Sequence, residues 1–153
     1  MHHYERAVHD GGEYELGLDP NARAFPAHSL SELRPVFEKL ENWMRVLGYA
    51  RKDIFAVTLA LHEAAANGIR HGHRGDPRKR LYVRYLVTPD VVVLEVEDEG
   101  PGFDVSQAPD PLLDEYIDRP CGRGLFLMRA YMSWVSYNPA GNRVTLGRRR
   151  SAS

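Results

Sequence analysis

The chain has 153 residues, of which 43% are hydrophobic and 27% charged, the size and composition of a single folded domain. Its formal net charge of −1 gives no electrostatic reason to expect a nucleic-acid partner. No apolar run reaches the roughly 18 residues of a membrane span, and the N-terminus lacks the basic and then apolar order of a signal peptide. A single cysteine, Cys121, cannot form an internal disulfide. We therefore expect a cytoplasmic protein that contacts neither nucleic acid nor membrane directly.

The beginning of the chain predicts a flexible segment and then a strand. Residues 1–13 are expected to be a flexible N-terminus, and residues 14–150 one domain. Polar and apolar residues alternate over 14–18, which predicts a first strand at a sheet edge. A turn at 19–21 and a loop as far as His28 should follow.

Apolar residues recur at three- and four-residue steps between residues 30 and 47. This spacing predicts an amphipathic helix that ends at Gly48, with Trp43 widening its apolar stripe. Pro35 must lie near the first turn of the helix, because deeper in it would remove a hydrogen bond. The stripe can face the core or, in its heptad-like spacing, the seam of a homodimer.

A second helix is predicted from residue 54 to about 71, with Asp53 as its N-cap. It is apolar on most of its surface and should be largely buried. The rest of the chain predicts two antiparallel strands, a long proline-rich loop that can act as a lid, a third helix and a closing hairpin. These elements are expected at residues 81–87, 91–98, 104–120, 124–132, 133–138 and 143–148. The expected fold is an α+β two-layer sandwich, a mostly antiparallel sheet with helices on one face.

Polar residues interrupt the second helix at four-residue intervals, at Glu63, Asn67 and His71. This interval places them on one face of the helix. A carboxylate and an amide in an otherwise apolar helix need a partner or a cavity, and a divalent cation with oxygen ligands would supply one. A partly exposed polar stripe explains the same spacing.

A second motif, Asp98-Glu99-Gly100-Pro101-Gly102-Phe103, follows a hydrophobic strand. A carboxylate such as Asp98 accepts hydrogen bonds, so it can read the exocyclic amine of adenine. Gly100 and Gly102 let the backbone approach a flat base, and Phe103 can form a pocket wall. A strand that ends in a tight turn explains these residues equally well.

The third motif, Gly122-Arg123-Gly124-Leu125, is expected to open the third helix. The free N–H groups of a helix start attract phosphate, and Arg123 can add a charged contact. A flexible hinge is the alternative. No P-loop motif occurs in the chain, so the three motifs together indicate an ATP site of another kind.

The three motifs, in this order, resemble the N, G1 and G2 boxes of the GHKL ATPase and kinase superfamily. The resemblance extends from about residue 30 to 148 and is nearest to its small stand-alone branch, the anti-sigma regulatory factors and serine-protein kinases of partner-switching systems. About thirty residues precede the first helix. We therefore do not expect the helical dimerisation segment of a sensor histidine kinase.

The resemblance implies the cofactors ATP and Mg²⁺, with Glu63 as general base, Asn67 as magnesium ligand and Asp98 as the adenine-specific acceptor. It implies that the four motif glycines shape the nucleotide pocket, and that Asn142 stands where several relatives have a threonine near adenine. These glycines are Gly100, Gly102, Gly122 and Gly124.

The implied activity is phosphorylation of a serine or threonine on a STAS-type anti-anti-sigma protein. A sigma factor would be the second partner, and a homodimer is expected by resemblance. The alternative function is a nucleotide-sensing anti-sigma binding module without kinase turnover. His62, His71 and His73 lack the spacing of a zinc site, and His71 is expected to cap or line the helix end.

Overall fold

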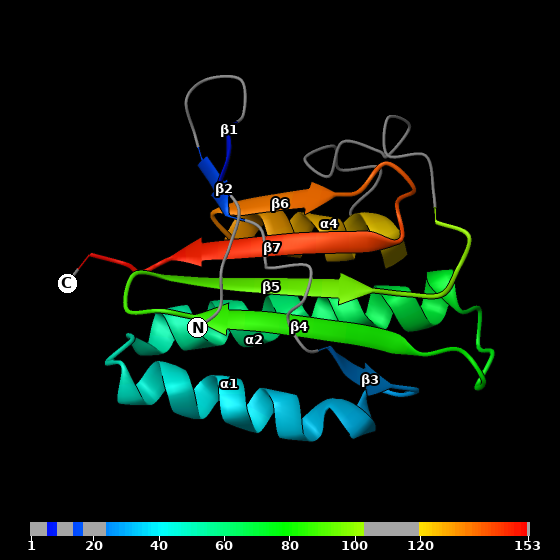
Figure 1. The fold of residues 1–153 in the computed structure, drawn as a ribbon, viewed down its shortest axis with the longest axis horizontal. Helices are drawn as coiled ribbons and strands as arrows, with labels where there is room; N and C mark the ends of the chain where they lie inside the picture. Colours follow the sequence, from blue (N-terminus) through cyan, green and yellow to red (C-terminus); the bar gives the residue numbers. More distant parts are fainter. Residues whose placement is uncertain (1–5, 9–13, 17–23, 103–119, 153) are drawn as a thin grey trace.

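A computed structural model describes residues 6–8, 14–16, 24–102 and 120–152 of the chain. Its main sheet has five strands in the order β3-β4-β5-β7-β6, and every neighbouring pair is antiparallel. Three helices, α1, α2 and α4, cover one face of this sheet (Figure 1). The predicted α+β sandwich is therefore confirmed. The strands are β3 (Phe25–Ala27), β4 (Leu81–Val87), β5 (Val91–Glu97), β6 (Trp134–Tyr137) and β7 (Arg143–Arg149).

The core lies between the sheet and the helices, with α2 (Arg51–Asn67) at its centre, in contact with α1 (Arg34–Val46), α4 (Pro120–Tyr131), β5 and β7. Strand β5 is central, and all its residues from 91 to 96 are buried, as its apolar run predicted. The closing hairpin of β6 and β7 is also confirmed. Within the described part of the chain, no helix is long and apolar enough to cross a membrane.

The N-terminal strand prediction is only partly confirmed. Residues 14–16 form β2 (Tyr14–Leu16), but β2 pairs with β1 (Arg6–Val8) in a separate two-stranded sheet. One edge of the main sheet is β3, in the segment where we expected a loop. Pro26 is tolerated there because an edge strand leaves one side unpaired, while Phe25 and Ala27 face the core. Residues 17–23, with the predicted turn, lie outside the described residues.

The first helix begins with a short 3₁₀ turn, η1 (Ser31–Leu33), before α1. Pro35 lies in the first turn of α1, and Gly48 follows the helix with a φ of 78°, as expected. Trp43 was predicted on the buried stripe, but its side chain is 52% exposed. The buried residues of α1 are Val36, Leu40 and Met44, a narrower stripe than the sequence suggested.

The prediction that Asp53 caps the second helix is wrong. The N-cap of α2 is Ala50, and Asp53 lies in the first turn, fully buried. Its carboxylate accepts hydrogen bonds from Arg148 and Ser151, so the buried negative charge is paired with the Arg148 guanidinium.

After Asn67 the helix continues as a π-helical turn, η2 (Gly68–Gly72), which ends with a bond from the His73 amide to the Gly68 carbonyl. A π-turn has more residues per turn than an α-helix. The turn therefore departs from the regular four-residue spacing after Asn67, and the His71 side chain is exposed, whereas those of Glu63 and Asn67 are half-buried.

The third helix, α4, begins at Pro120, four residues before the predicted start at Gly124. Proline is favoured at the first position of a helix, because its missing N–H would have no partner there. Gly122 and Gly124 therefore lie within the early turns of the helix and do not precede it. Residues 103–119, which include Phe103 and most of the predicted lid, lie outside the described residues.

Candidate functional site

The first and third motifs meet where α2 crosses α4. A methyl group on Gly124 would lie 2.7 Å from Asn67 Nδ2 and 3.0 Å from Asn67 Oδ1, closer than side-chain carbons approach other atoms. Glycine therefore lets α4 rest against the Asn67 amide without displacing it. Gly124 and Leu125 are both buried at this crossing, whereas the Asn67 side chain is half-buried.

The second motif meets the π-helical turn that follows Asn67. Asp98 comes directly after β5, and its carboxylate lies against Gly72, where a methyl group would overlap Asp98 Oδ1. Gly68 faces the Asp98 side chain at an ordinary contact distance of 3.4 Å, measured from the position of an added methyl group. The same segment thus places both residues: Asn67 stands at its start, and Asp98 packs along its side.

The Asp98 carboxylate is half-buried and is held by its own turn, because the Gly100 amide donates a 2.7 Å hydrogen bond to Asp98 Oδ1. Burial raises the pKa of Asp98, against the opposing effects of the Gly100 amide and of His73. Within residues 24–102 and 120–152, the Gly100 amide is the only donor to this carboxylate, which leaves Oδ2 as an acceptor. A carboxylate oxygen of this kind can accept a hydrogen bond from an amino group.

The closing hairpin reaches the same corner through Asn142 and through Ala140, which contacts Gly102 of the second motif. The Asp98 amide donates to the Asn142 carbonyl at 2.9 Å, and Asn142 Nδ2 donates to the Asp98 carbonyl at 3.3 Å. Asn142 Oδ1 accepts from Asn138 Nδ2 at 2.8 Å. Gly102 has a φ of 74° and lies against the Ala140 carbonyl. Asn142 therefore supports the backbone of Asp98, and its predicted contact with the base stays a prediction.

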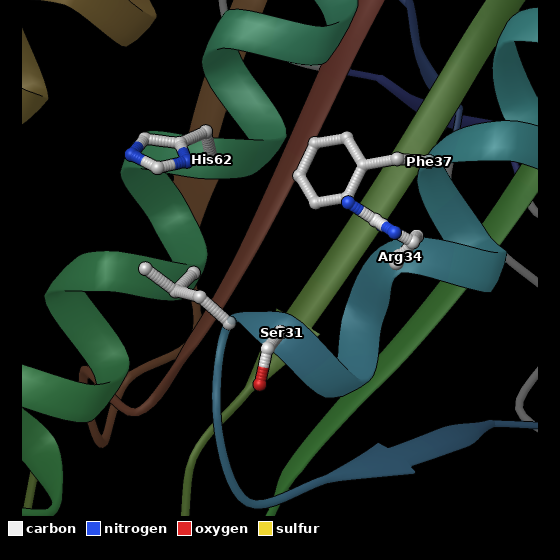
Figure 2. A pocket seen from close by; sticks show the side chains of 5 residues that line it. Ser31, Arg34, Phe37 and His62 are labelled. Atoms are coloured by element: carbon white, nitrogen blue, oxygen red, sulfur yellow. The ribbon is translucent and has the colours of Figure 1, made fainter.

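Glu63 lies one helical turn before Asn67 on α2, and its side chain is half-buried. The preceding residue, His62, is exposed and lines a shallow pocket with Leu30, Ser31, Arg34 and Phe37 from the start of α1 (Figure 2). Arg34 and Phe37 project from α1 on the other side of this pocket. The surface between His62 and the start of α1 is therefore concave and carries a positive side chain, Arg34.

The structure leaves part of the predicted set undescribed. Phe103 lies outside the described residues, and for Gly122 and Arg123 only the helical backbone is described. Among the described residues, no group of three His, Cys, Asp or Glu side chains could hold a metal ion. A magnesium ion at this site would therefore rest on Asn67 together with phosphate oxygens and water, the coordination Mg²⁺ commonly has beside nucleotides.

Sequence reasoning missed two residues that support the site, His73 and Arg80, which both bond to Glu99 of the second motif. His73 is buried, and its Nε2 accepts a 3.2 Å hydrogen bond from the Glu99 amide. The Glu99 carboxylate in turn accepts a 2.6 Å bond from the Arg80 amide. Neither His73 nor Arg80 lies on a periodic face or in a recognised spacing, so only the folded chain brings them to Glu99.

Comparison with known proteins places this site in a family. The family model of the histidine kinase-like ATPase domain matches residues 26–148, so the chain belongs to that family. Serine-protein kinase RsbW of Bacillus licheniformis is 29% identical over 97 residues, which are 58% of this chain and 59% of that protein. Anti-sigma F factor of Oceanobacillus iheyensis is 24% identical over 129 residues, which are 81% of this chain and 77% of that protein.

A solved structure agrees with the fold. The crystal structure of the RsbU and RsbW domains of a Mycobacterium tuberculosis protein matches with a TM-score of 0.51 and 16% identity, over 90% of this chain and 36% of that chain. The family resemblance expected from the three motifs is confirmed by these findings. The chain spans 59% of the length of the Bacillus licheniformis kinase, so the activity and partners of the whole relative are proposals for this protein.

Proposed function

We propose that this protein is a magnesium- and ATP-dependent serine/threonine protein kinase that also acts as an anti-sigma factor. The observation that carries the proposal is the common placement of Asn67 and Asp98 by one continuous helical segment. Asn67 lies at the start of that segment, with its amide next to Gly124 of α4. The half-buried carboxylate of Asp98 packs against Gly72 at the end of the segment. An amide for magnesium and phosphate and a carboxylate for the base, both placed by one segment, fit an adenine nucleotide.

In this function the chain mainly positions groups, as phosphoryl transfer requires. Asp98 Oδ2 accepts a hydrogen bond from the adenine amino group, and the first turn of α4 faces the phosphates with free N–H groups. Asn67 holds Mg²⁺, which supplies positive charge to the phosphate oxygens when bound. Glu63 accepts the proton of the acceptor hydroxyl, whose oxygen bonds the γ-phosphorus while ADP leaves with the bridging oxygen.

We propose a STAS-type anti-anti-sigma protein as the phosphate acceptor and a sigma factor as the second partner, in a cytoplasmic setting. Support comes from the names of the two relatives, a serine-protein kinase and an anti-sigma factor. The net charge of −1 gives no support for a nucleic-acid partner. A homodimer belongs to the same proposal.

One alternative is a nucleotide-sensing anti-sigma module that binds its partners without phosphorylating them. The half-buried Glu63 beside Asn67 favours the kinase, since a module that only binds has no need of a general base. Both alternatives require an adenine nucleotide at the same site.

The first test is therefore nucleotide binding, measured as the melting temperature with Mg²⁺ and ATP, ADP or GTP. At a ligand concentration one hundred times the dissociation constant, binding stabilises by about 2.7 kcal/mol, which is about 5–10 °C for a domain of this size. We expect this shift with ATP and ADP and a smaller one with GTP. No shift with either adenine nucleotide would exclude both alternatives.

The second test separates the kinase from the binding module. The protein is incubated with γ-labelled ATP, Mg²⁺ and a purified STAS-domain protein from the same genome. Transfer of label to a serine or threonine supports the kinase. Tight nucleotide binding without transfer to any STAS protein of that genome supports the binding module.

A further inference from the structure

His73 is a buried titratable residue that the proposed mechanism does not use. It follows the π-helical turn directly, and its side chain is 2% exposed. Its Nε2 accepts a 3.2 Å hydrogen bond from the amide of Glu99, the middle residue of the turn between Asp98 and Gly100. The imidazole thus joins the segment that carries Asn67 to the turn that carries Asp98.

The turn is held from several directions, and His73 supplies the side-chain contact that comes from the π-helical segment. Arg80 donates its amide to the Glu99 carboxylate at 2.6 Å, and the Gly100 amide donates to Asp98 Oδ1 at 2.7 Å. The Gly72 backbone lies against the Asp98 carboxylate and against Gly100. Movement of the Glu99 amide would therefore displace the neighbouring Asp98 carboxylate from its place against Gly72.

The bond to Glu99 fixes the protonation state of the ring. An imidazole accepts at Nε2 only when it is neutral, with its proton on Nδ1. Burial lowers the pKa of His73, and Lys79 lowers it further, whereas the carboxylates of Asp98 and Glu99 raise it; the net direction is down. Protonation would turn the acceptor into a donor that faces another N–H group, and the bond would break.

We propose that neutral His73 is a positioning residue for nucleotide recognition, which holds the Glu99 amide so that the Asp98 carboxylate faces the base. This inference rests on the proposed adenine-nucleotide site. It adds a consequence that the proposed function lacks: nucleotide affinity depends on the protonation of a residue that does not touch the nucleotide.

Two substitutions separate the hydrogen bond from the packing of the ring. His73→Gln places a non-titrating oxygen near the position of Nε2, where it accepts from the Glu99 amide. His73→Phe fills the space without an acceptor. The measurement is the dissociation constant of ADP with Mg²⁺, by calorimetry, from about pH 8 to pH 5.

We expect His73→Phe to weaken ADP binding about tenfold at pH 8, the value of one hydrogen bond to a positioned group. The wild type should weaken by a similar factor as the pH falls below 6.5, the ordinary pKa of histidine, because His73 charges only below that value. His73→Gln should bind ADP as the wild type does at pH 8 and should lack this additional loss. Asp98 and ADP titrate in all three proteins, so the difference between wild type and His73→Gln reports His73.

A second readout does not depend on nucleotide. In the free protein, the amide resonance of Glu99 should follow the titration of His73 in the wild type and should not do so in His73→Gln. Wild-type affinity in His73→Phe at pH 8, or equal pH profiles for wild type and His73→Gln, would overturn the proposal. If the wild type binds no ADP, the proposed function fails and this role fails with it, while the Glu99 resonance still shows whether the hydrogen bond exists.

Discussion

Arg148 in β7 and Asp53 in the first turn of α2 form an ion pair whose Nη2 and Oδ1 atoms are 2.8 Å apart. The Asp53 side chain is 0% exposed and that of Arg148 is 19% exposed. Arg148 Nη1 also donates to the carbonyl of Tyr131, the last residue of α4. A single guanidinium therefore connects the sheet to the two helices that form the candidate site.

Arg148→Ala should destabilise the fold by about 3–5 kcal/mol, because it leaves a buried carboxylate without its partner. The measurement is the free energy of unfolding in urea. Arg143→Ala is the matched control on the same strand, since Arg143 is 45% exposed and lies 4.0 Å from Glu97. The control should change stability by at most about 1 kcal/mol. Equal losses in the two variants would contradict the assigned role of the pair.

The same pair predicts how stability depends on acid. Burial raises the pKa of Asp53, but hydrogen bonds from Ser151 and Arg148 outweigh it and hold the pKa below 3.8. A folded-state pKa below the unfolded value gives stability that is complete above the unfolded pKa and lost as the pH falls through the folded one. The stability difference between wild type and Asp53→Asn should therefore shrink from about pH 4 downward, measured by urea unfolding. A constant difference over that range would show that the pKa of Asp53 is the same in the folded and unfolded states.

Glu63→Gln should reduce phosphorylation of the STAS acceptor by about 100-fold or more, because the amide cannot accept the hydroxyl proton. Affinity for ADP should stay within about twofold of the wild type, since the carboxylate acts on the acceptor and not on the nucleotide. The control is Glu38→Gln, an exposed glutamate of α1 that should leave both quantities unchanged. Undiminished transfer in Glu63→Gln would remove Glu63 from the mechanism.

Gly124→Ala separates the site from the fold. The added methyl group would displace the Asn67 amide, which is the end of a flexible side chain, so the helix crossing can survive. Alanine also favours a helix by up to about 1 kcal/mol over glycine. We expect a melting temperature near that of the wild type and an affinity for Mg²⁺ and ADP reduced about tenfold or more.

A double-mutant cycle with Asn67→Ala checks this cause. If Gly124→Ala acts through the amide, it should add little to the loss already caused by Asn67→Ala. Losses that simply add would show that the two residues act separately.

Much of the fold could be predicted because its signals are periodic. The apolar run of β5, the strand pair of β4 and β5, and the closing hairpin all follow from local patterns. The errors lie where a distant contact decides. Asp53 has the sequence features of an N-cap, but its carboxylate bonds to Arg148, which is 95 residues away. Pro26 is typical of a loop in the sequence, but its segment pairs with β4 in the fold.

The candidate site divides in the same way. Glu63, Asn67, Asp98 and Gly124 could be singled out because each belongs to a short motif of suitable chemistry. The supporting residues His73 and Arg80 could not, since hydrogen bonds from the loop between η2 and β4 to Glu99, after β5, follow no sequence spacing. The π-helical turn was missed for a related reason, because nothing in the residues 68–72 distinguishes it from a continued α-helix.

Strand β7 has a consequence for how the protein is made. It is the final strand in chain order, yet it lies between β5 and β6 and pairs with both. The central strand β5 therefore keeps one unpaired edge until residues 143–149 have left the ribosome. A nascent chain that stops short of them exposes the valines of β5 to other chains, so the domain is protected from aggregation only once β7 has emerged or the edge is shielded.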